Sequence, residues 1–271
     1  MSSLRTIGTV AVNVFRESVR DKVLYNLVVF AVLLMAASYL IGQLTAGQDI
    51  KIIKDLGLAA IATFGLMIAV FIGIGLVWKE VERRSIYSLL SKPLSRAEFI
   101  LGKYCGLGLT LVVNVLVMVV AWYVVLAYMA TTVPPEVRAS WPAPATDLGM
   151  LRAVGLILVE LMLVTAIALF FSTFSSPFLS AGFTLGLWVV GHFNADLKNF
   201  EGVVDSRAAA WVAHGLYYVL PNFSAFDIKQ QAVYAQAVPA TYLATTALYG
   251  AVYIALLLTA SVAVFSRRDF K

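Results

Sequence analysis

Five stretches of this sequence are almost free of charge, and each is long enough to cross a lipid bilayer. A membrane-spanning helix needs about 20 apolar residues. The stretches are residues 23–48, 56–78, 104–135, 153–195 and 230–266. The fourth stretch contains one charged side chain, Glu160, and is long enough for two spans. The pattern predicts an all-α polytopic membrane protein with six transmembrane helices in a single domain, residues 1–271.

The distribution of basic residues predicts the orientation of these helices. The chain is 61% hydrophobic and 13% charged, whereas a soluble domain is about 45–50% apolar and 25% charged. With six spans, 13 of the 20 basic residues fall on one side of the membrane. Cytoplasmic loops are enriched in Lys and Arg, so both termini are expected in the cytoplasm. The net charge of +5 is explained by topology and does not indicate nucleic-acid binding.

Residues 4–22 predict an amphipathic helix before the first span. One face carries Ile7, Val10, Ala11, Val14 and Ser18, and the other carries Asn13, Arg16, Glu17 and Arg20. A basic amphipathic helix at this position is expected to lie in the inner membrane interface. A plain cytoplasmic segment that leads into the first span fits these residues equally well.

The most highly charged stretch, residues 78–103, lies between the second and third spans. Residues 80–91 can form a short helix, about 18 Å long, with an apolar side and a charged side. The apolar side carries Ile86, Leu89 and Leu90, and the charged side carries Glu80, Glu82, Arg83 and Arg84. The simpler interpretation is a charged loop that only keeps the protein oriented.

A proline and a capping box follow this predicted helix. Pro93 ends the helix, because proline lacks the backbone N–H and restricts the residue before it. Ser95 and Glu98 then match the Ser-x-x-Glu capping box that starts a new helix. We call residues 79–96 the elbow. A helix, a proline and a cap in series exceed what a passive connection requires, so the elbow is expected to be a structured cytoplasmic unit.

A long outer segment, residues 195–240, is expected to contain short helices before the sixth span, because structureless loops of this length are uncommon. One helix is predicted over 208–220 and another over 227–238, each ended by a proline. A seventh span at 208–226 would have only about 13 helical residues before Pro221, too few to cross the membrane. It would also move the C-terminus outside. A re-entrant or interfacial helix fits better.

The sequence contains no catalytic or nucleotide-binding motif. His192 and His214 are not in an HExxH pattern, and no GxSxG pattern occurs. The only Gly-Lys pair, at 102–103, has Ala97 and Tyr104 where a P-loop has glycine and Ser or Thr. The chain is therefore not expected to bind ATP and Mg²⁺ itself. Both histidines are expected to be interfacial residues rather than metal ligands.

Glu160 is the one acidic residue well inside a predicted span. A charge at that depth is costly, so the carboxyl is expected to face the bundle interior or water, to be paired, or to be neutral. Asn114 lies at a similar depth in the third span and is a candidate partner. A hydrogen bond between helices and a residue of a translocation path are equally compatible with this position.

The elbow resembles the loop between spans two and three in permeases of type-2 ATP-binding-cassette (ABC) exporters. The family pattern is acidic residues, a short helix ending in Leu-Leu-Ser-x-Pro, an arginine, an apolar run and Gly-Lys. The residues of this sequence that match the pattern are Glu80 and Glu82, Leu89-Leu90-Ser91-Lys92-Pro93, Arg96, Phe99-Ile100-Leu101 and Gly102-Lys103. The closing residues 265–270 are similar to the common C-terminal ending of these permeases. Within the family, the chain looks most similar to the membrane subunit used in copper-enzyme (nitrous-oxide reductase) maturation.

This resemblance implies two permease copies in the lipid membrane around a central pathway, each resting its elbow on a separate ABC ATPase subunit. The elbow would be the coupling helix, and ATP and Mg²⁺ would bind to the ATPase. The residues expected at that contact are Glu80, Glu82, Arg83, Arg84, Ile86, Leu89, Leu90, Pro93 and Arg96. No cargo-binding residue follows, because the family has no shared motif for one.

Two other functions compete with the exporter. An intramembrane enzyme could use Glu160 and His192 as acid and base, but the sequence places Glu160 in the middle of a span and His192 near an outer end. A membrane assembly or anchoring protein would need no transport at all. Co-purification of an ATPase would separate the exporter from both.

We predict that single cysteines, introduced after Cys105 is replaced, will be labelled from the cytoplasm in the elbow and at both termini. Cysteines at 136 and 200 will be labelled from outside, because the basic residues concentrate on the opposite side. The measurement is labelling by a membrane-impermeant maleimide in intact and opened cells. A cytoplasmic signal from residue 200 would contradict the six-span topology.

Overall fold

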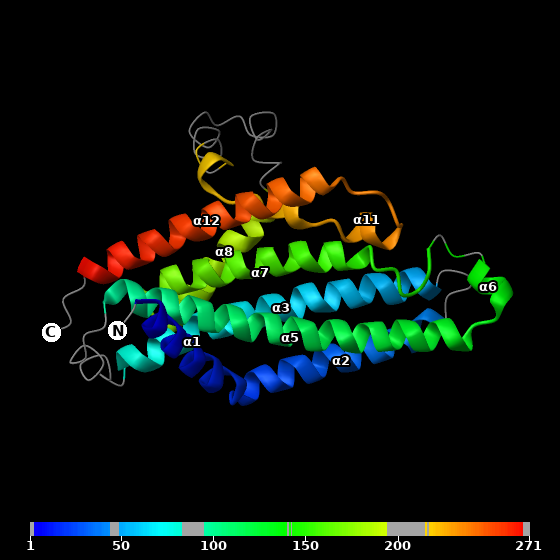
Figure 1. Ribbon diagram of the computed structural model, residues 1–271, viewed down its shortest axis with the longest axis horizontal. Helices are drawn as coiled ribbons and strands as arrows, with labels where there is room; N and C mark the ends of the chain where they lie inside the picture. Colours follow the sequence, from blue (N-terminus) through cyan, green and yellow to red (C-terminus); the bar gives the residue numbers. More distant parts are fainter. Residues whose placement is uncertain are drawn as a thin grey trace.

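The computed structural model describes residues 3–43, 49–82, 95–139, 141, 143–193, 215 and 217–267, with only the backbone of 76–82. The regular elements within these residues are all helical, as predicted. Five helices contain a stretch that is long and apolar enough to cross a membrane. They are α2 (Lys22–Gln43), α3 (Asp49–Glu82), α5 (Arg96–Thr132), α7 (Met150–Ser172) and α12 (Ala240–Arg267). These helices form one elongated bundle, with the N-terminal helix and the end of α12 at the same end (Figure 1).

The sixth predicted crossing corresponds to α8 (Pro177–His192). The helix begins at Pro177 and ends at His192, and Ser176 occupies the N-cap position. A serine followed by a proline is also a local sequence signal for a helix start. With 16 residues, however, it is about 24 Å long, whereas the hydrocarbon core is about 30 Å thick. Five spans are therefore supported by the structure, and the sixth is not confirmed.

Helix α7 forms the centre of the bundle (Figure 1). Small residues let α3 approach it closely. A Cβ atom placed on Gly65 would collide with Leu161 Cδ1, and one placed on Gly73 would lie 2.6 Å from Ala168 Cβ. Most of the inner half of α7, from Leu161 to Leu169, is buried. The core therefore lies along the α3–α7 contact, with α5, α8 and α12 around it.

The N-terminal helix α1 (Ser3–Val19) packs against the first turns of α5. Gly102 and Gly106, one turn apart, permit this contact, since a Cβ atom on Gly106 would lie 2.6 Å from the carbonyl oxygen of Ala11. Val10 and Val14 fill the remaining space. The apolar face predicted for residues 4–22 is thus the face that contacts α5, while the interfacial position of the helix stays a prediction.

The outer segment before α12 contains two short helices among its described residues, η2 (Phe223–Phe226) and α11 (Lys229–Val233). The helix predicted over 227–238 is shorter than expected. It ends because Ala235 has a positive φ of 53°, a conformation that a right-handed helix excludes. Of the helix predicted over 208–220, residues 215 and 217–220 are described, and 215 and 217–219 among them are helical.

This outer segment packs down onto the bundle. Phe223 and Phe226 are fully buried, and η2 contacts α7 and α8 while α11 contacts α3 and α7. The loop between α5 and α7 carries a further short helix, α6 (Pro135–Ala139), at the end of the bundle opposite α1 (Figure 1). Lys54 of α3 holds the loop that precedes α7, because its Nζ donates to the Pro144 carbonyl at 3.0 Å.

We predict that Gly106→Ala will destabilise the protein by about 1–3 kcal/mol, because the new methyl group meets the backbone of α1 rather than a flexible side chain. The matched control is Gly182→Ala in α8, where a Cβ atom meets nothing within 4 Å. That change should be neutral or slightly stabilising, since alanine favours helix. Thermal unfolding in detergent measures both variants, and equal midpoints would contradict the α1–α5 packing.

Candidate functional site

Glu160 lies on the central helix α7, is 7% exposed, and faces α8. Trp188 Nε1 donates a hydrogen bond of 2.8 Å to Glu160 Oε1. His192 Nε2 lies 3.8 Å from the same oxygen, one helical turn further along α8. The carboxyl group is therefore paired inside the bundle, as its depth in the membrane requires.

Asn114 is not the partner of Glu160, so that prediction was wrong. Its Nδ2 donates to the Thr110 carbonyl on its own helix, at 2.7 Å. Helix α7 meets α5 through Met162, whose carbonyl accepts a hydrogen bond from Tyr104 Oη at 3.3 Å. Glu160 is two residues away, which is about 200° around an α-helix. The face that carries Glu160 therefore points away from α5.

The sequence also separated His192 from Glu160, and the structure corrects this. Helices α7 and α8 are antiparallel, and a short turn joins them after Ser172. Glu160 lies 12 residues before Ser172, and Trp188 lies 12 residues after Ser176, so the two meet at the same depth. Because α8 ends early, His192 is only one turn beyond that level. In two antiparallel helices, residues that are equally far from the connecting turn lie at the same depth. This spacing could have identified Trp188 as the partner of Glu160 from the sequence alone.

His192 contacts two aromatic rings. The Trp188 ring centroid is 4.4 Å from the imidazole centroid, and the Phe223 ring stacks on the imidazole at 5.8 Å and 14°. The Nδ1 atom lies 3.2 Å from the Trp188 carbonyl oxygen. The ring orientation is therefore fixed by its own helix and by η2.

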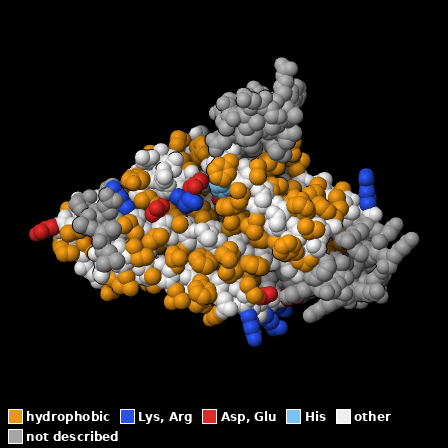
Figure 2. Space-filling view, turned by 180° about the vertical axis from the view of Figure 1, so that it is seen from behind, with side chains coloured by type: hydrophobic (Ala, Val, Ile, Leu, Met, Phe, Trp, Pro, Cys, Tyr) orange, Lys and Arg blue, Asp and Glu red, His pale blue; other side chains and the backbone are white. Residues whose placement is uncertain are grey.

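A second charged pair completes this site. Lys229 Nζ lies 3.3 Å from Asp227 Oδ2, and both groups interact electrostatically with Glu160 and His192. We call Glu160, Trp188, His192, Asp227 and Lys229 the polar cluster. Figure 2 shows charged side chains beside a histidine in the middle of a largely apolar surface. The sequence did not identify Asp227 and Lys229, because they come from the outer segment.

The polar cluster can hold a proton or present polar groups to a permeating molecule. It contains two carboxyl groups and one imidazole, and no group of three or more His, Cys, Asp or Glu side chains that could hold a metal ion occurs among the described residues. His192 is paired with Glu160 and with backbone, not with a nucleophile. The geometry is that of a group of polar side chains within a bundle of membrane helices.

The elbow is described only at its two ends. Glu80 and Glu82 lie in the last turn of α3, so the separate helix predicted to begin at residue 80 was wrong at its start. The predicted contact residues from Arg83 to Pro93 lie outside the described residues. The capping box after them is confirmed: Glu98 N donates to Ser95 Oγ at 3.2 Å, and Ser95 N donates to Glu98 Oε2 at 3.0 Å.

Arg96 ties the exit of the elbow to the C-terminal helix. Its Nη1 donates to the carbonyl oxygens of Phe265 and Ser266, at 2.9 and 2.6 Å. These carbonyls belong to the last turn of α12, where unpaired acceptors and the negative end of the helix dipole favour a cation. Phe99 stacks on Phe265 in addition, at 5.7 Å and 18°. The guanidinium group expected at the ATPase therefore contacts α12.

Comparison with protein families gives a match over nearly the whole chain. Residues 9–270 match the family described as "ABC-2 family transporter protein". The chain belongs to the ABC-2 transporter family. Members of this family are transport subunits that do not hydrolyse ATP themselves, and they imply an ATPase partner. No curated protein matches this ABC-2 chain significantly. The proximity of Glu160 to His192 thus belongs to a permease and does not support the intramembrane enzyme.

We predict that Glu160→Gln will be tolerated, because an amide oxygen can accept the Trp188 N–H. Glu160→Leu will cost about 1–3 kcal/mol, since it leaves that buried donor unpaired. Thermal unfolding in detergent and membrane yield measure the effect. The double variant Glu160→Leu/Trp188→Phe removes donor and acceptor together and should recover part of the loss. No recovery, or a Leu variant as stable as the parent, would show that the hydrogen bond has no such role.

Proposed function

We propose that this chain is the membrane subunit of an ABC exporter, that two copies form the transport path, and that each contacts a separate ATPase through the elbow. The observation that carries the proposal is the anchoring of Arg96. The elbow connects α3 to α5, and Arg96 joins the start of α5 to the end of α12. A displacement of the elbow would therefore move three long helices together.

Helix length supports a cytoplasmic contact. Helices α3 and α5 have 34 and 37 residues, so they are about 51 and 56 Å long, well beyond the hydrocarbon core of about 30 Å. The first turns of α5, residues 96–103, lie at the end of the bundle where α1 packs on α5. The concentration of basic residues at this end supports a cytoplasmic location. Rigid helices of this kind can transmit motion from a partner to the membrane.

The polar cluster supports the transport path. His192, Asp227 and Lys229 have side chains that are 25%, 38% and 27% exposed on an apolar surface. Lipid tails cannot solvate such groups, so this surface needs water or another protein beside it. A second permease copy facing the cluster across a hydrated path meets that need. The overall resemblance of the sequence to these permeases supports a place in the bacterial inner membrane and in the enzyme-maturation subgroup.

We predict that Glu82→Lys will weaken or uncouple the ATPase, because charge complementarity at such a contact fixes its register. Leu89→Asp will do more damage, since it places a charge in an apolar contact. ATP turnover and transport of the reconstituted permease–ATPase complex measure both variants, alongside the amount of permease in the membrane. The control is Glu136→Lys in the exposed helix α6. Normal turnover and transport in both variants would make the elbow a passive loop.

Arg96 tests the anchoring itself. Arg96→Gln should leave ATPase binding intact and lower the transport obtained per ATP hydrolysed, because the link to α12 is lost. Arg267→Gln, at an exposed position in the last turn of α12, is the matched control and should have little effect. Loss of ATPase binding in the Arg96 variant would instead place its guanidinium group at the ATPase contact.

A further inference from the structure

Helix α1 has two apolar faces, and the bundle covers only one of them. The covered face carries Val14, which is buried against Gly106 of α5. The second face carries Leu4, Val12 and Val19, which are 81%, 43% and 53% exposed. The apolar face predicted from the sequence is therefore used for packing on α5, and a further apolar surface of the same helix has no contact in the bundle that would cover it.

The exposed apolar residues form one stripe along the helix. Successive residues of an α-helix are about 100° apart around its axis, so Leu4, Val12 and Val19 point within about 80° of one another. Gly8 lies between Leu4 and Val12 on the same side, and a Cβ atom placed on it would meet nothing within 4 Å. We call these four residues the exposed stripe. It runs from the first turn of α1 to its last residue.

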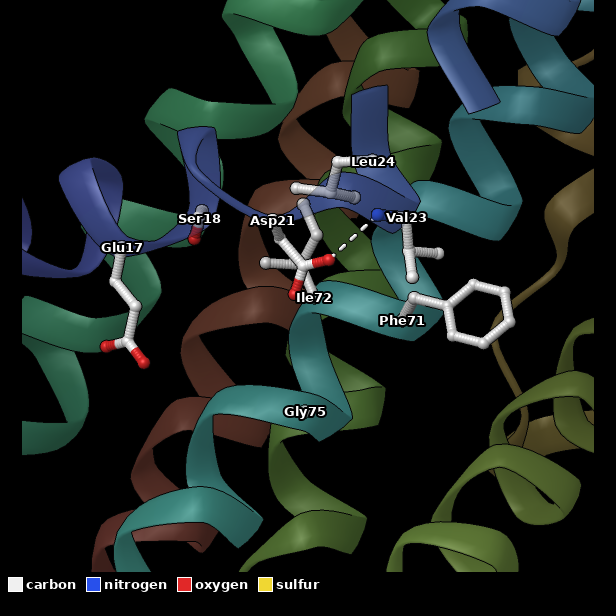
Figure 3. Close-up of a pocket in the computed structure, with 8 residues that line it drawn as sticks. All are labelled: Glu17, Ser18, Asp21, Val23, Leu24, Phe71, Ile72 and Gly75. Carbon is white, nitrogen blue, oxygen red and sulfur yellow. Dashed lines mark hydrogen bonds between the residues drawn. The ribbon is translucent and has the colours of Figure 1, made fainter. Parts of the chain in front are cut away.

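The exposed stripe ends where the chain enters the membrane. Helix α2 begins three residues after α1 and is the first helix long and apolar enough to span. At this corner, Val23 of α2 and Phe71 of α3 line the same cavity and lie side by side (Figure 3). Both are exposed, whereas Glu17 of α1 extends on the far side of the view. Exposed apolar side chains thus occur on both sides of the corner, on α1 and on the spanning helices.

A basic edge borders the exposed stripe. Arg5 and Arg16 lie within about 20° of each other around α1, and within about 40° of Val12. Both are exposed, and neither guanidinium group forms an ion pair among the described residues. Glu17, the one acidic residue of α1, lies about 140° from Val12. The positive charge of the helix is therefore next to the stripe, and its negative charge is not.

This order of apolar and basic sectors identifies the class of partner. A helix that lies in a membrane interface places its apolar side at the boundary of the acyl chains and its Arg and Lys side chains at the headgroups. Guanidinium groups pair with phosphates in a bidentate geometry, and basic side chains are attracted by anionic lipids. The neighbouring span α2 holds the end of α1 at the membrane surface. Phospholipid is therefore the partner that fits both sectors.

We propose that α1 docks on anionic phospholipid, with the exposed stripe among the acyl chains and Arg5 and Arg16 at the phosphate groups. The apolar residues in contact with lipid are thus on a different face from the one that the sequence predicted. Because the covered face of α1 packs on the first turns of α5, this contact would tie the exit of the elbow to the membrane surface. The proposal does not depend on the exporter function.

The first test measures whether lipid reaches the exposed stripe. In a Cys105→Ser background, Val12→Cys or Asn13→Cys is labelled with bimane, and the full-length chain is reconstituted into vesicles. The vesicles contain equal amounts of dioleoyl phosphatidylcholine and dioleoyl phosphatidylglycerol, with a doxyl quencher on the acyl chains. Bimane at residue 12 should be quenched more strongly than bimane at residue 13, since the two positions point about 100° apart. Equal quenching, or an unquenched residue 12 that faces water, would overturn the proposal.

The second test identifies the headgroup. With the doxyl group on only one of the two lipids, labelled phosphatidylglycerol should quench residue 12 about three- to fivefold more than labelled phosphatidylcholine, as one basic contact with an anionic surface allows. Arg5→Gln/Arg16→Gln should lower this ratio toward one. Both side chains are exposed, so the packing of α1 on α5 should remain.

The matched control is Arg138→Gln/Arg152→Gln, which makes the same change in net charge at exposed positions near the opposite end of the bundle. It should leave the quenching ratio unchanged. A ratio of one in the parent protein, or an undiminished ratio in the Arg5→Gln/Arg16→Gln variant, would overturn the proposal. An equal loss in the control variant would also do so, because the preference would then follow net charge rather than the basic edge of α1.

Discussion

The structure depends on the enclosure of α7 by four other helices. Lipid tails are as apolar as the helix surfaces, so helices in a membrane associate through close packing rather than through exclusion of water. Four consecutive residues of α7 each meet a different helix: Val159 meets Gly250 of α12, Glu160 meets Trp188 of α8, Leu161 meets Gly65 of α3, and Met162 meets Gly108 of α5. Glycine forms the contact in three of the four cases. The fourth contact is polar.

This enclosure explains why Glu160 defines a site. A carboxyl group on a surrounded helix has no access to bulk water and must find its partner on the facing helix. The facing helix α8 is the shortest of the long helices, and η2 and α11 lie beyond and beside it. The outer segment therefore brings Phe223, Asp227 and Lys229 to the depth of Glu160. A polar position in the membrane is created by a helix that ends early.

The end of the bundle that carries α1 has a different organisation. There α1 packs on α5 through two glycines, and Arg96 holds the last carbonyls of α12. These contacts join the N-terminus, the exit of the elbow and the C-terminus into one unit. Under the proposed function, that unit lies where the ATPase partner would act. The polar cluster and the elbow are thus connected by continuous helices rather than by loops.

The sequence by itself determined the helical class, the long apolar helices, the capping box at Ser95 and the start of α8 at Pro177. These features depend on local rules of periodicity, capping and proline geometry, which act within a few residues. The family also followed from sequence, through the elbow and the C-terminal residues. Only the tertiary structure decided the partners of Glu160, the contact of Arg96 with α12 and the contact of Gly106 with α1. A partner depends on the rotation and depth of each helix relative to its neighbours, and the packing of the whole bundle sets both.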